Sequence, residues 1–166
     1  KRRTRILLRA GGGVHAALQP SMRETYFPTM PLVSVGIGVE WRTAPRTELL
    51  VDVAFGRAAY ELPGLYEQVS VETHLDAGLS YRFVKELSGF RMALGPRFAL
   101  LSYWRRPPGD QLSGFSLGID GGIGMRVRDR VGVALDVRVG YMLNQTAQED
   151  QSHVHTQALL RFDLAL

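Results

Sequence analysis

The chain has 166 residues, no cysteine and a formal net charge of +4, which excludes a disulfide framework and a thiolate metal site. No run of residues approaches the roughly 18 consecutive apolar residues of a membrane-spanning helix. A membrane-spanning β-barrel stays open, because its apolar residues alternate with polar ones. The arginines are spread along the chain among acidic residues, so we expect no nucleic-acid partner.

Eight segments alternate apolar residues with small or charged ones at a period of two, which is the period of a β-strand. They span residues 3–18, 32–42, 47–58, 67–84, 90–104, 112–127, 130–141 and 152–166. In the seventh segment Val133, Leu135 and Val137 alternate with Asp136 and Arg138. Each segment therefore predicts a strand with one apolar face and one charged face.

The connections between these strands alternate in length. Short ones are predicted at residues 43–46, 85–89 and around 129, and longer ones at 19–29, 60–66, 105–111 and 144–151. This pattern predicts an up-and-down antiparallel meander with short turns at one rim and long loops at the other. Pro96 lies inside a segment, and because it has no amide hydrogen we expect a bulge or local break there.

Over all eight segments, the charged face holds nearly equal numbers of cations and anions, interspersed with Gly, Ala and Ser. An eight-stranded barrel has an interior only just wide enough for side chains, and the many large apolar residues would overpack it. Ions in a confined space also need partners. We therefore predict that the charged face lines the lumen, with an ion-pair network of Arg9, Glu40, Asp52, Glu72, Asp76, Arg82, Arg97, Asp120, Arg126, Asp136, Arg138 and Arg161.

Aromatic residues gather near the ends of the predicted strands. Two aromatic bands that flank an aliphatic belt are typical of membrane β-barrels. The membrane girdle predicted from this pattern comprises Trp41, Tyr81, Phe83, Phe90, Trp104, Phe115, Tyr141 and Phe162. The alternative is a soluble lipocalin-like barrel or sandwich with the apolar face inside, because the alternation on a single strand fits both arrangements.

The last segment alternates hydrophobic residues up to the final position, as Leu160-Arg-Phe162-Asp-Leu164-Ala-Leu166. With the strand count and loop asymmetry, it resembles the small eight-stranded outer-membrane barrels of Gram-negative bacteria, the OmpA/OmpX-type group. The resemblance implies an all-β, eight-stranded antiparallel up-and-down transmembrane barrel in the bacterial outer membrane. It also implies that the short turns face the periplasm and that the outer-membrane assembly machinery recognises the last strand. That group usually ends in Phe or Trp, whereas this chain ends in Leu166.

We expect residues 1–166 to form a single outer-membrane β-barrel domain, alone or as the C-terminal part of a longer chain. Its expected role is that of a non-catalytic membrane anchor or interaction platform without a cofactor. Expected partners are outer-membrane lipid and lipopolysaccharide, and a protein bound by the outer loops or an upstream periplasmic domain. Arg23, Arg105 and Arg106 in the outer loops are candidate contacts for lipopolysaccharide phosphates, but a solvated loop is the favoured interpretation of these arginines. A narrow pore, a soluble carrier and a lipid A-modifying enzyme are the alternatives.

The enzyme alternative depends on one polar region before the last strand. Ser152 with His153 or His155, and Glu149 or Asp150, supply the residue types of a nucleophile–histidine–acid arrangement. Ser152 and His153 are adjacent, however, and adjacent residues of a strand point to opposite faces. We therefore assign no catalytic residue.

Three histidines share the lumen-facing parity near the long-loop rim. His15 lies on the first segment, and His153 and His155 lie on the last, which is its neighbour once the barrel closes. Imidazoles grouped in this way are candidate ligands for Zn²⁺ or another divalent metal. Histidines at a rim are more often ordinary polar residues, so no metal site is assigned.

Overall fold

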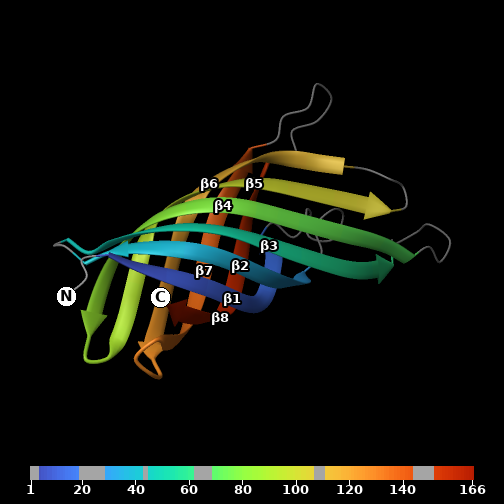
Figure 1. Ribbon diagram of the computed structural model, residues 1–166. Coiled ribbons are helices and arrows are strands. Elements are labelled where there is room, and N and C mark those ends of the chain that lie inside the picture. The colour runs from blue at the N-terminus through green and yellow to red at the C-terminus, as the bar shows by residue number, and fades with distance from the viewer. Residues whose placement is uncertain (1–3, 19–28, 43–44, 62–68, 107–110, 144–151) are drawn as a thin grey trace.

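The computed structural model describes residues 4–18, 29–42, 45–61, 69–106, 111–143 and 152–166. The strands in these ranges are β1 (Thr4–Ala17), β2 (Met30–Trp41), β3 (Thr47–Glu61), β4 (Val69–Leu87), β5 (Phe90–Arg106), β6 (Gln111–Arg126), β7 (Val131–Leu143) and β8 (His153–Ala165). Each strand pairs antiparallel with the next, and β8 pairs with β1, so the sheet closes into a barrel (Figure 1). The predicted strand count and up-and-down topology are confirmed. No helix in the described ranges is long and apolar enough to cross a membrane.

Side chains alternate between the outside and the inside of the barrel along every strand. In β7, Leu135 and Val137 are 48% and 46% exposed, whereas Asp136 and Arg138 are 0% and 2% exposed. The apolar residues therefore cover the outer surface and the charged residues line the interior, as predicted. A soluble barrel has the opposite arrangement, so the lipocalin-like alternative is wrong.

Several leucines share the interior with the charged residues. Leu7, Leu50, Leu101 and Leu159 are all 3% exposed or less, and the parity of the sequence places them on the charged face. Leu159 packs with Leu32 and Ala54 in a small apolar cluster inside the barrel. The interior is therefore filled by side chains, with apolar patches between the ions.

The predicted irregularity at Pro96 is a local break in one ladder and not a bulge. β4 and β5 pair Ser80 with Arg97 and Phe83 with Leu94 in a constant register, but the pairs between them, opposite Pro96, are missing. A bulge would shift the register by one residue, and no shift occurs. The ladder lapses because proline has no N–H to donate.

The hairpin between β4 and β5 turns on two residues. Ser88 and Gly89 have φ values of 47° and 89°, and two consecutive residues with positive φ match the type I′ turn that suits the twist of paired strands. β4 therefore continues to Leu87, beyond the predicted end at residue 84. At the other rim β3 extends to Glu61, past the predicted end at residue 58, because backbone pairing with β4 continues after the apolar alternation weakens.

Candidate functional site

Arg82 on β4 lies at the centre of the barrel interior, with its side chain 0% exposed. Its Nη2 donates to Glu48 Oε1 on β3 at 2.9 Å, and its Nη1 lies 3.3 Å from Asp120 Oδ1 on β6 and 3.5 Å from Asp136 Oδ2 on β7. One guanidinium therefore connects strands on opposite walls of the barrel. Its five N–H donors make it suited to several carboxylates at once.

A second guanidinium, that of Arg97 on β5, bridges two carboxylates further toward the long-loop rim. Its Nη1 lies 2.7 Å from Asp52 Oδ1 and its Nη2 lies 2.7 Å from Asp76 Oδ1. Gln157 on β8 donates to the other oxygen of Asp76 at 2.6 Å. Arg138 on β7 contacts the second oxygen of Asp52. This layer of the lumen is therefore held by side chains from β3, β4, β5, β7 and β8.

The layer nearer the short turns is built in the same way. Arg9 on β1 pairs with Glu48, and its Nε lies 3.3 Å from Asp163 Oδ1 on β8. Arg161 Nε also lies 2.8 Å from Asp163 Oδ1, and Arg161 pairs with Asp136 across the β7–β8 ladder. Arg91 also forms an ion pair with Glu48. Glu48 therefore has three arginine partners, Arg9, Arg82 and Arg91.

The structure brings together most of the predicted lumen residues, and Arg126 is the exception. The Arg126 side chain is 48% exposed at the short-turn mouth, and its Nη2 lies 3.6 Å from Glu86 Oε1. The alternation gives the face of a residue but not its depth, and Arg126 is the last residue of β6. Glu72 is buried on β4, and Glu40 pairs with Arg42 and Arg91 near the same mouth.

Several members of the network do not stand out in the sequence. Glu48 has the same parity as Asp52, so the alternation places it in the lumen, yet its role as the partner of three arginines depends on side chains that cross the barrel. Ser80 donates to Asp120 at 2.8 Å, and Gln157 donates to Asp76. Both are neutral, so a pattern of charges gives no signal for them.

All four histidines of the chain lie in one layer near the long-loop rim, each 3% exposed or less. His15 and His74 stack with ring centroids 4.3 Å apart, and His15 lies 5.6 Å from His155 by the same measure. His15 Nε2 is 3.1 Å from the Tyr103 hydroxyl, and His155 Nε2 is 2.7 Å from the Ser116 hydroxyl. The ring centroid of His153 lies 6.2 Å from that of His155, so the structure brings together the three histidines named from the sequence, His15, His153 and His155. His74 was missed because it comes from β4 across the lumen.

The imidazoles contact one another and hydroxyl groups. Among the described residues no group of three or more histidine or carboxylate side chains is arranged to hold a metal ion. Of the residues considered for catalysis, His153 is buried in this layer and Ser152 comes just before β8. Glu149 and Asp150 lie outside the described residues, as does Arg23.

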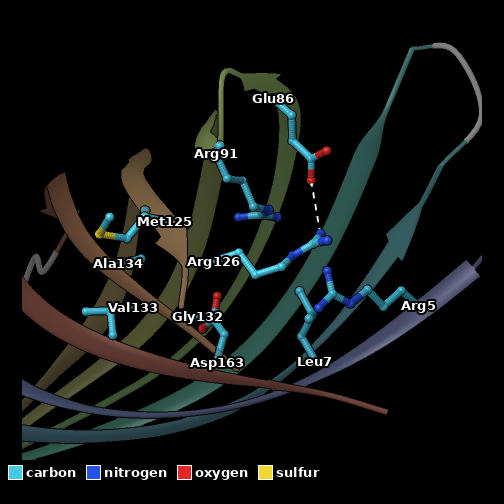
Figure 2. Close-up of a pocket in the computed structure, with 12 residues that line it drawn as sticks. Arg5, Leu7, Glu86, Arg91, Met125, Arg126, Gly132, Val133, Ala134 and Asp163 are labelled. Atoms are coloured by element: carbon cyan, nitrogen blue, oxygen red, sulfur yellow. Dashed lines mark ion pairs between the residues drawn. The ribbon is translucent and has the colours of Figure 1, made fainter. Parts of the chain in front are cut away.

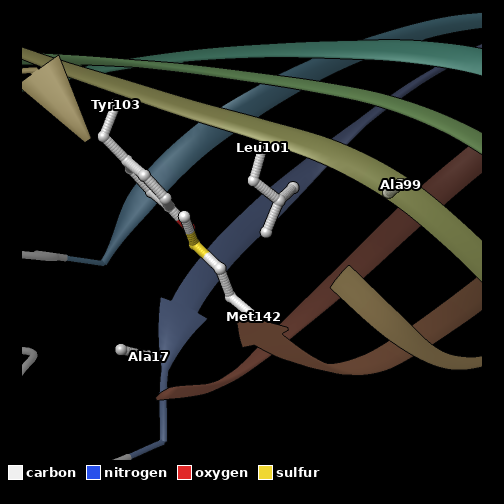
Figure 3. Close-up of a cluster of buried hydrophobic side chains, with 5 residues drawn as sticks. All are labelled: Ala17, Ala99, Leu101, Tyr103 and Met142. Atoms are coloured by element: carbon white, nitrogen blue, oxygen red, sulfur yellow. The ribbon is translucent and has the colours of Figure 1, made fainter. Parts of the chain in front are cut away.

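An apolar cluster adjoins the histidine layer. Ala17, Ala99, Leu101, Tyr103 and Met142 are buried together, and Leu112 packs against them. Figure 3 shows Leu101 and the Tyr103 ring directed toward Met142 from a different strand. Tyr103 belongs to both groups, because its ring packs in the cluster while its hydroxyl reaches His15. Together the two groups lie in the lumen at this end of the barrel.

The predicted girdle residues lie on the outer surface. Trp41, Tyr81, Phe83, Phe90, Phe115, Tyr141 and Phe162 are between 36% and 55% exposed, and Trp104 is half-buried. Tyr81 and Phe83 meet edge to face with centroids 5.8 Å apart. Their contact with lipid headgroups stays a prediction.

A closed antiparallel barrel with an apolar outer face and an ion-paired interior belongs to the class of outer-membrane β-barrels. The fold and the apolar surface are those of a barrel that crosses a membrane with its strands, as the outer-membrane barrels of Gram-negative bacteria do.

Among solved structures, the chain is similar to the crystal structure of Neisserial surface protein A. The identity is 14% and the TM-score 0.64, over 98% of this chain and 97% of that one. It is also similar to Ail, the attachment invasion locus protein of Yersinia pestis, in complex with the heparin analogue sucrose octasulfate. Here the identity is 11% and the TM-score 0.53, over 98% and 97% of the two chains. No family model and no curated protein matches the sequence. At these identities the similarity concerns the fold.

Proposed function

We propose that this barrel is a non-catalytic membrane anchor or interaction platform whose lumen is closed by its own side chains. The observation that carries the proposal is the ion-pair network that spans the barrel interior. Arg82, Arg97 and Arg138 each reach carboxylates on other strands. An eight-stranded barrel has little interior space beyond that of its side chains, so we expect a network of this extent to leave no continuous path for ions.

The physical basis of the role is rigidity. The apolar belt enters the hydrocarbon of the membrane, and closure of the sheet satisfies the backbone amides that lipid cannot. Ion pairs across the lumen then hold opposite walls at a fixed distance. The long loops would be displayed on this frame and make the specific contacts, with lipopolysaccharide or a protein as the partner. Arg106, which is exposed at the end of β5, is one candidate contact for lipopolysaccharide phosphates.

Conductance across a planar bilayer tests the closed lumen. The purified barrel, folded in detergent and shown to be heat-modifiable on a gel, is added to the bilayer at neutral pH. We expect no current steps above those of detergent alone. A variant with both Arg97→Ala and Arg138→Ala removes two guanidinium groups from the lumen and provides the matched comparison, for which we expect small steps. Stable, reproducible steps from the unaltered chain would contradict the proposal.

Mass spectrometry of lipid A tests the absence of catalysis. Cells that produce the unaltered chain, the Ser152→Ala variant or neither should yield the same lipid A species. Loss or gain of an acyl chain that requires the unaltered chain and disappears with Ser152→Ala would favour the enzyme alternative instead.

A further inference from the structure

A pocket of about 200 Å³ opens at the short-turn mouth of the barrel. Arg5 from β1, Arg91 from β5 and Arg126 from β6 line it, together with Glu86 and Asp163. Figure 2 shows the guanidinium groups of Arg5 and Arg126 in the same space, with Arg126 directed to Glu86. A single water needs about 10–15 Å³ of such space, so the pocket has room for an organic molecule.

Positive charge in this region exceeds the carboxylates that are available to it. Glu40 is shared by Arg42 and Arg91. Glu86 is shared by Arg126 and by Arg46, whose Nη1 lies 2.6 Å from Glu86 Oε2. The hydrogen bond and the negative charge of Glu86 raise the pKa of Arg46. Because Glu86 is shared between Arg46 and Arg126, it neutralises Arg126 only in part.

Arg5 has no carboxylate within ion-pair distance among the residues that the structure describes, and it lines the same pocket as Arg91 and Arg126 (Figure 2). Glu40, which lies opposite Arg5 in the β1–β2 ladder, is already paired with Arg42 and Arg91. Asp163, the other acid of the pocket, is already paired with Arg9 and Arg161. A ligand with negative charge would therefore relieve a repulsion that the chain leaves in place.

The rest of the lining is apolar or lacks a side chain. Leu7 and Ala134 are buried at the inner side, and Gly89, Gly124 and Gly132 have no side chain. Met125 and Val133 also border the pocket, at positions that belong to the outer face of the barrel. A bare inorganic ion would leave this apolar surface uncovered. A second hollow at the mouth shares Arg5 and Arg126 and adds Arg42, Arg130 and Asp129, so cations outnumber anions there as well.

We propose that this pocket binds an organic anion, with its carboxylate or phosphate between Arg5 and Arg126 and its apolar part against Leu7 and Ala134. Guanidinium groups bind both oxyanions through charge-assisted, often bidentate hydrogen bonds. The short-turn mouth faces the periplasm in the orientation expected from the resemblance. The anion then comes either from solution on that side or from a lipid headgroup at the rim.

Titration of the detergent-folded barrel, followed by NMR at the amides of Gly89, Gly124 and Gly132, tests the proposal. The probes are benzoate, phenyl phosphate and dihexanoylphosphatidylglycerol, with benzyl alcohol as the neutral analogue. We expect saturable shifts with at least one anion at millimolar concentration or below, and none with benzyl alcohol. Saturation by benzoate or phenyl phosphate identifies a soluble ligand, and saturation by the phospholipid alone identifies a headgroup.

Two variants locate the site. Arg5→Gln should weaken binding at least tenfold, because it removes the cation that lacks a carboxylate partner. Arg57→Gln makes the same change of charge at an exposed position of β3 toward the other rim, and should leave binding unchanged. Equal weakening by both variants, an unchanged affinity with Arg5→Gln, or no saturation by any of the three anions would overturn the proposal. Neither position belongs to the buried network, and heat-modifiable mobility verifies that each variant is folded.

Discussion

Arg82 and Glu48 meet in the middle of the barrel with both side chains 0% exposed and a separation of 2.9 Å between Nη2 and Oε1. Neither charge reaches water, so each depends on the other and on further partners for its solvation. Burial of an ion pair costs desolvation energy that the attraction between the two charges repays only with good geometry. The pair as a whole therefore adds little to net stability, whereas removal of one partner leaves the other charge buried without it.

Removal of one member of this pair should be costly. Arg82→Met leaves Glu48, Asp120 and Asp136 without a shared cation, and loss of one partner of a buried pair typically costs about 3–5 kcal/mol. We expect a decrease of that order in the free energy of unfolding, measured by urea titration in detergent with tryptophan fluorescence. The exposed turn residue Arg128 supplies the control, and Arg128→Met should change the value little. A loss below about 1 kcal/mol for Arg82→Met would show that the network is not a coupled unit.

The fold was predictable from the sequence because one variable, the parity of each residue, determines the face on which its side chain lies. The size of the apolar residues, the aromatic bands and the charge balance then identified the inner face. Depth and contacts across the lumen were not predictable from parity. Arg126 shares the parity of Asp120 yet lies at the mouth, and His74 joins His15 from the opposite wall of the barrel.

The outer face should respond to a charge according to its depth in the membrane. Val137 lies in the middle of β7 and is 46% exposed, whereas Val131 is the first residue of the strand and is 37% exposed. Arginine on the lipid face costs about 2–4 kcal/mol at the bilayer midplane and about 0–1 near the interface. We expect Val137→Arg to lower the free energy of unfolding in lipid vesicles by the larger amount and Val131→Arg by the smaller. Equal costs at both positions would contradict the assignment of the apolar belt.

Gly78 makes room for a guanidinium group. A Cβ atom at Gly78 would clash with the Arg97 guanidinium, which is held between Asp52 and Asp76. Gly78→Ala should therefore displace Arg97 and destabilise the barrel by about 1–3 kcal/mol. Gly12 faces outward, and a Cβ there makes only an ordinary contact with the Leu32 carbonyl, so Gly12→Ala should be neutral or slightly stabilising. Urea unfolding of both variants checks the difference, and a neutral Gly78→Ala would mean that Arg97 has an alternative position of equal energy.

The histidine layer offers a substitution that should stabilise the barrel. Neither ring nitrogen of His74 has a hydrogen-bond partner among the described residues, and the side chain is 0% exposed. A buried polar group without a partner costs about 1–3 kcal/mol, so His74→Phe should raise the free energy of unfolding while it preserves stacking on His15. His155→Phe is the matched comparison and should be destabilising, because it removes the 2.7 Å hydrogen bond with Ser116. Urea unfolding at neutral pH measures both effects, and a loss of stability with His74→Phe would indicate that a water molecule or ion binds its nitrogens.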